Sequence, residues 1–86
     1  MDFSNKESNQ QLADYLREQR LKQSLNLDDV SSKIGVPIQH LKNIENGDFS
    51  KFDEFYLKMY IKKYANFLSL NVDEIYQLFY GEQIKK

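Results

Sequence analysis

The chain has 86 residues, and its 12 basic and 13 acidic side chains leave a formal net charge of −1. This length supports one hydrophobic core and leaves no room for a second domain. The absence of cysteine excludes disulfides and thiolate metal sites, and the apolar runs of at most three residues exclude a membrane span or a signal peptide.

The first nine residues are polar apart from Met1 and Phe3, so residues 1–9 are predicted to form a flexible tail. Residues 10–23 contain good helix formers, and Leu12 and Leu16 stand four residues apart on one face. The sequence therefore predicts a first amphipathic helix here.

The next stretch, residues 27–47, predicts two short helices joined by a tight turn, the first ending before Gly35 and the second opening at Pro37 and ending at Gly47. Asn26 can accept hydrogen bonds from the free N–H groups that open the first of them. Gly35 suits the left-handed backbone that ends a helix, and the fixed φ of Pro37 suits the start of the next. Apolar side chains recur at helical spacing, at Val30, Ile34, Leu41 and Ile44. This pattern is typical of a helix-turn-helix.

Two further helices follow. Asp53 can cap a long helix over residues 55–68, and Asn71 can cap a fifth one. Residues 10–80 are thus expected to form one all-α domain of five helices, and residues 81–86 a second polar tail. The buried face of the fifth helix is predicted to consist of Ile75, Leu78 and Phe79.

Catalytic chemistry finds little support in the sequence. His40 is the single histidine and has no second ligand at metal spacing, and the three glycines are too far apart for a phosphate-binding loop. Paired acids stand at predicted helix starts, where the helix dipole accounts for them, at Asp28-Asp29, Asp53-Glu54 and Asp73-Glu74. We expect no catalytic residue, no metal and no cofactor.

Four short segments resemble the phage-repressor (Cro/XRE-like) helix-turn-helix domain: residues 16–20, 25–27, 35–36 and 44–47. The resemblance implies an all-α, five-helix domain of the repressor helix-turn-helix type. It also implies an ion pair between Arg20 and Glu45, because the matching residues of repressor domains join the first helix to the end of the third.

The C-terminal half of the chain resembles a more specific family. Residues 45–49, followed by Tyr-Ile-Lys-Lys-Tyr-Ala at 60–65, resemble the cytoplasmic domain of RodZ, a bacterial cell-shape protein. This implies a domain on the cytoplasmic side of the cell membrane that binds the actin-like protein MreB or another cell-shape or division protein. The chain would then be an N-terminal piece of a longer protein with one membrane helix. Lys85-Lys86 would begin its positively charged approach to the membrane.

The long predicted helix offers a candidate partner-binding surface at Tyr56, Tyr60, Lys63 and Phe67. These residues follow helical spacing and flank the stripe of Leu57, Ile61, Tyr64 and Leu68, which is predicted to be core. Tyrosine beside lysine suits an interface, since its ring buries area while its hydroxyl stays polar. On the residues alone, a purely intramolecular role for these aromatics stays open. The RodZ resemblance favours binding, because Tyr56 and Tyr60 fall on the aromatic pair that meets MreB in that family.

The alternative function is a DNA-binding transcriptional regulator. In repressor-type motifs the exposed face of the second helix reads base edges, here Ile38, Gln39, Lys42 and Asn43, with His40 to one side. Gln39 and Asn43 could hydrogen-bond adenine, but Ile38 offers only an apolar contact. The alternative interpretation of these side chains is a solvated helix face.

Charge argues against strong DNA binding. Dedicated DNA-binding domains carry a basic surplus that neutralises phosphates, and this chain has none. In repressor domains a glutamine at the position of Leu27 often binds a DNA phosphate, and leucine cannot do so. Asp48 adds a negative charge just after the motif. We therefore expect at most weak, salt-sensitive DNA binding.

Overall fold

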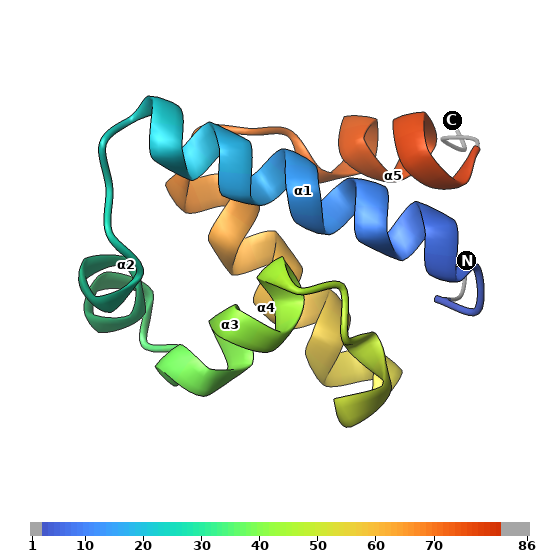
Figure 1. Cartoon of the computed structure of the whole chain (residues 1–86), viewed down its shortest axis with the longest axis horizontal. Coiled ribbons are helices and arrows are strands. Elements are labelled where there is room, and N and C mark those ends of the chain that lie inside the picture. The colour runs from blue at the N-terminus through green and yellow to red at the C-terminus, as the bar shows by residue number, and fades with distance from the viewer. Residues whose placement is uncertain (1–2, 82–86) are drawn as a thin grey trace.

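The computed structural model describes residues 3–81 (Figure 1). In that range the chain is helical and contains no strand, which confirms the all-α, five-helix prediction. The elements are α1 (Lys6–Lys22), α2 (Leu27–Ile34), α3 (Ile38–Glu45), the short 3-10 helix η1 (Phe49–Lys51), α4 (Glu54–Phe67) and α5 (Val72–Tyr80). Figure 1 shows α1 and α5 side by side along one edge, with α4 beginning on the opposite side and running towards them.

Three helices, α2, α4 and α5, start at the residues that the sequence predicted as caps. The side chain of Asn26 accepts from the N–H of Asp29 at 2.8 Å at the start of α2, and Asp53 accepts from the N–H of Phe55 at 3.1 Å at the start of α4. Asn71 caps α5 in the same way. Each cap satisfies an N–H group that has no partner within its own helix.

The turn between α2 and α3 is fixed by a glycine and a serine. Gly35 has φ +72°, in the left-handed region that a residue with a Cβ atom enters at a cost. The hydroxyl of Ser31 donates to the carbonyl of Val36 at 2.6 Å, which fastens the end of α2 to the turn. These local contacts set the angle at which α3 leaves α2.

The core lies where α1, α3 and α4 meet. Leu12, Leu16, Leu41 and Ile44 are completely buried there. The residues of the predicted stripe come from α4 and its C-cap, and all are at most 1% exposed: Leu57, Ile61, Tyr64 and Leu68. Burying each such side chain stabilises the fold by about 1.5–3 kcal/mol. The central helix is therefore held by one face along most of its length.

The N-terminal tail prediction is wrong from residue 3 onwards. Helix α1 begins at Lys6, because Asn5 accepts from the N–H of Ser8 at 3.0 Å and caps it. The ring of Phe3 packs edge-on against Phe49 and Tyr80, with centroids 5.4 and 5.6 Å apart. A single apolar residue in a polar segment thus anchors the segment to the core.

The prediction for α5 is wrong at one position. Ile75 is buried and Phe79 is partly buried, but Leu78 is 68% exposed. No helix within residues 3–81 is both long and apolar enough to cross a membrane. Of the predicted C-terminal tail, residues 82–86, with Lys85 and Lys86, lie outside the described residues.

Candidate interaction surface

The expected Arg20–Glu45 ion pair is present and bidentate. Arg20 donates from Nε to Glu45 Oε2 at 2.7 Å and from Nη2 to Oε1 at 2.9 Å, and a third N–H reaches the carbonyl of Leu25 at 2.9 Å. The side chains are 12% and 7% exposed. This pair joins α1 to the end of α3 and is charge-assisted and largely shielded from water.

Tyr64 of α4 completes this group by donating its hydroxyl to Glu45 Oε2. Burial and the hydrogen bond to Glu45 raise the pKa of Tyr64 well above its usual range, so it remains a neutral donor. The hydrogen bond to Glu45 also raises the pKa of Arg20. We call Arg20, Glu45 and Tyr64 the polar triad; it links α1, α3 and α4 and has a structural role.

A continuous row of aromatic rings runs from α3 and the residue after η1 along the first turns of α4. Tyr60 stacks on His40 with centroids 5.2 Å apart and an interplanar angle of 26°, and Tyr56 stacks on Tyr60 at 6.4 Å and 28°. The ring of Phe55 meets Tyr56 edge-on at 5.5 Å, and Phe52 packs against both His40 and Tyr60. We call these five residues the aromatic strip.

Exposure increases along the strip towards the start of α4. His40, Phe52 and Tyr60 are partly buried, whereas Tyr56 is 52% exposed and Phe55 70%. Sequence reasoning missed Phe55, although its position in the first turn of α4 beside Tyr56 is visible in the sequence. Of the other predicted partner-binding residues, Lys63 is exposed and Phe67 is partly buried against the core.

The predicted DNA-reading residues occupy α3. Gln39 and Lys42 are exposed, while Ile38 and Asn43 are half-buried. The side chain of Gln39 donates to Asn43 Oδ1 at 3.2 Å, one helical turn away. The structure therefore brings these polar side chains together on one face, but two of them already bond to each other.

His40 lies to one side of these residues, in contact with the other rings of the aromatic strip. Its ring stacks on Tyr60 and meets Phe52 edge-on, and its Nδ1 atom is buried without a hydrogen-bond partner among the described residues. Stacking on Tyr60 turns the imidazole towards α4. The residue predicted as a flanking DNA contact thus joins α3 to the aromatic strip.

The surface around the motif carries no basic surplus. Lys33, Lys42 and Lys51 are exposed, but residues 27–51 also hold four acidic side chains. One of these, Glu45, is neutralised by Arg20; the others are Asp28, Asp29 and Asp48. The three lysines and three aspartates balance, which leaves little net attraction for phosphates.

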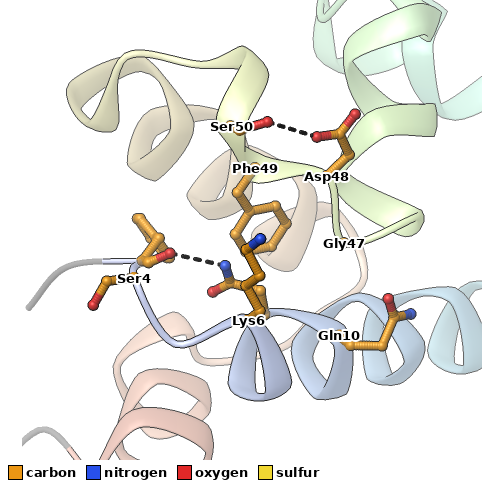
Figure 2. Close-up of a pocket in the computed structure, with 9 residues that line it drawn as sticks. Ser4, Lys6, Gln10, Gly47, Asp48, Phe49 and Ser50 are labelled. Carbon is orange, nitrogen blue, oxygen red and sulfur yellow. Dashed lines mark hydrogen bonds between the residues drawn. The ribbon is translucent and has the colours of Figure 1, made fainter.

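A hollow of about 450 Å³ lies between the N-terminal segment and the loop after α3 (Figure 2). Two hydrogen bonds join groups of its lining: Ser50 donates to Asp48 at 2.9 Å, and Asn9 donates to the carbonyl of Phe3 at 2.9 Å. Gly47, at φ +74°, leaves room for Gln10, whose Oε1 would lie 2.7 Å from an added Cβ atom. The hollow thus lies where the N-terminal segment packs against the loop after α3.

A family model described as a helix-turn-helix domain matches residues 15–75. The chain belongs to the helix-turn-helix domain family. The matched segment begins within α1 and ends within α5, so it includes the motif and all of α4. Searches among curated proteins and solved structures found no significant match. This fold serves both DNA binding and protein interaction, so the choice between them depends on surface chemistry.

Proposed function

We propose that this helix-turn-helix domain is the protein-interaction module of a RodZ-like membrane protein. It docks on an actin-like protein of the MreB type, or on another cell-shape or division protein, through Tyr56, Tyr60, Lys63 and Phe67 of α4. The sequence resemblance at residues 45–49 and 60–65 supports this proposal, and the family match is compatible with it. The resemblance also supports a place on the cytoplasmic side of the membrane, within a longer membrane-anchored protein.

The observation that carries the proposal is the exposure of two adjacent large aromatic side chains on α4, Phe55 and Tyr56. Leaving such rings in water forgoes the free energy that burying them would provide. Exposed aromatic side chains next to a lysine have the composition of a protein-binding site, where tyrosine is enriched. Tyr60, which is partly buried, stacks on Tyr56 and so helps to fix the position of that ring before a partner binds.

The proposal can be tested by co-sedimentation of the domain with polymerised MreB-type filaments. Tyr56→Ala is expected to weaken binding about 30-fold or more, because a central aromatic anchor contributes about 2 kcal/mol or more. Leu21→Ala is the matched control, since Leu21 is a comparably exposed apolar side chain on α1. Equal binding by both variants and the unaltered domain would refute docking through α4.

A second candidate function is transcriptional regulation through α3, favoured by the exposed Gln39 and Lys42 on an intact motif. The balanced charge around the motif supports only nonspecific affinity, with a Kd of roughly 10⁻⁴ to 10⁻⁶ M. A fluorescence anisotropy titration with duplex DNA at physiological salt measures it. Nanomolar binding to one sequence that Asn43→Ala abolishes would instead establish the regulator.

A further inference from the structure

An open groove lies along α1 and α5. Figure 1 shows these two helices on the opposite side of the fold from the start of α4. The groove consists of two adjoining hollows of about 250 and 490 Å³, and both are lined by Tyr15 and Leu78. The rings of Tyr15 and Phe79 lie 5.5 Å apart in its wall, and Leu78 is 68% exposed. The fold therefore leaves a large aliphatic side chain in water beside a partly buried aromatic pair.

The rim of this groove is acidic. Asp14, Glu18 and Glu74 line it, and no lysine or arginine of residues 3–81 does so. Asp14 pairs with Arg17 at 3.1 Å, whereas Glu18 and Glu74 form no ion pair within the described chain. An apolar groove with uncompensated acids fits an apolar ligand that carries positive charge.

The opposite chemistry is found on α4. Phe55 and Tyr56 are each followed, seven residues later, by a lysine, Lys62 and Lys63 respectively. Seven residues make two helical turns, so each ring and its lysine share one face about 10 Å apart. Both lysines are exposed and form no ion pair within residues 3–81. We call Phe55, Tyr56, Lys62 and Lys63 the α4 face.

We propose that the α1/α5 groove of one chain binds the α4 face of a second copy, in a head-to-tail arrangement. The exposed rings of Phe55 and Tyr56 pack against Leu78 of the neighbouring copy, and the lysines face Glu18 and Glu74. A symmetric dimer through two grooves is disfavoured, because it would bring those same acids against each other.

Because the two surfaces lie apart on the molecule, this contact is heterologous and leaves a free groove at one end and a free α4 face at the other. Copies can therefore add in a row. A partner bound to α4 would compete with the neighbouring copy for Tyr56. The inference shares that face with the proposed function, but variants in the groove separate the two, since they leave α4 unchanged.

Sedimentation velocity of the full 86-residue chain at low salt, over rising concentration, tests the proposal. The weight-average mass is expected to rise above that of the monomer and to fall back when salt screens the charges. Leu78→Asp is expected to weaken self-association about tenfold or more while leaving the helical circular dichroism signal unchanged. Lys33→Glu, a charge change on α2, is the matched control and should leave self-association unaffected.

Charge reversal decides between a head-to-tail and a symmetric contact. Chains with Glu18→Lys and Glu74→Lys, or with Lys62→Glu and Lys63→Glu, should each stay monomeric, and a mixture of the two should associate again. Self-association that survives the lysine reversals would mean that α4 takes no part and would overturn the proposal. So would a wild-type chain that stays monomeric up to about 1 mM, whatever its binding to filaments.

Discussion

Two tyrosines on α4, eight residues apart, have opposite surroundings: one lies in the core and the other on the surface. Tyr64 is completely buried and donates its hydroxyl to Glu45, which Arg20 also holds. Tyr56 is 52% exposed, and its ring contacts Phe55 and Tyr60 of the same helix. The residue type is the same, so position relative to the core decides whether the side chain stabilises the fold or remains available for binding.

The largest expected effect comes from breaking the polar triad. Glu45→Ala should lower the free energy of unfolding by about 3–5 kcal/mol, because Arg20 is left charged, largely shielded from water and without its partner. Urea unfolding followed by circular dichroism measures this. Lys58→Ala, which removes the exposed Glu54–Lys58 pair of α4, should cost only about 0.3–0.5 kcal/mol. Comparable losses in the two variants would contradict the structural role of the triad.

Removing only the Tyr64 hydroxyl should have a smaller effect. Tyr64→Phe leaves Glu45 with one donor fewer, at a cost of about 1–3 kcal/mol. The variant should also change the response to alkali. The folded-state pKa of Tyr64 is raised by burial, so its contribution is fully present below the unfolded-state pKa of about 10 and is lost as pH rises above it.

Urea midpoints at pH 8 and pH 10.5 test the alkaline effect. The unaltered chain should lose stability between the two values, and Tyr64→Phe should lose less. Burial also raises the pKa of Tyr80, so some loss remains in the variant. Identical losses in both chains would show that Tyr64 is not shielded as described.

Local chemistry explains which parts of the fold could be predicted from sequence. Asn26, Asp53 and Asn71 cap helices through N–H groups two or three residues away, and Gly35 adopts the left-handed backbone that ends α2. Such interactions depend on neighbours in the chain. The Arg20–Glu45 pair spans 25 residues and was predictable only through the resemblance to repressor domains.

Contacts between distant segments account for the errors. Phe3 is anchored by Phe49 and Tyr80, which no local pattern reveals. Leu78 sits at core spacing within α5, but α1 covers only part of that face. Which side chains contact His40 depends on how α4 packs against α3. In the structure this packing stacks the imidazole on Tyr60.

The smallest expected effects on stability come from the exposed aromatic side chains at the start of α4, and they contrast with the effect at a buried residue of the same helix. Phe55→Ala and Tyr56→Ala should each change the free energy of unfolding by no more than about 0.5 kcal/mol, because the two side chains are 70% and 52% exposed. Ile61→Ala should cost about 2–5 kcal/mol, since Ile61 is completely buried. Thermal or urea unfolding of the three variants side by side makes the comparison. A loss at Tyr56 as large as that at Ile61 would place Tyr56 in the core.

Tyr60 lies at the boundary between the two regions, and its variant gives the most direct test. Tyr60→Ala should stay folded, with a smaller loss of stability than Ile61→Ala, and should lose binding to MreB-type filaments by about 30-fold or more. Unfolding and co-sedimentation on the same preparation supply both numbers. If Tyr60→Ala destabilises the domain as much as Ile61→Ala, then Tyr60 is part of the core. If it binds filaments as well as the unaltered chain, then α4 is not the docking surface.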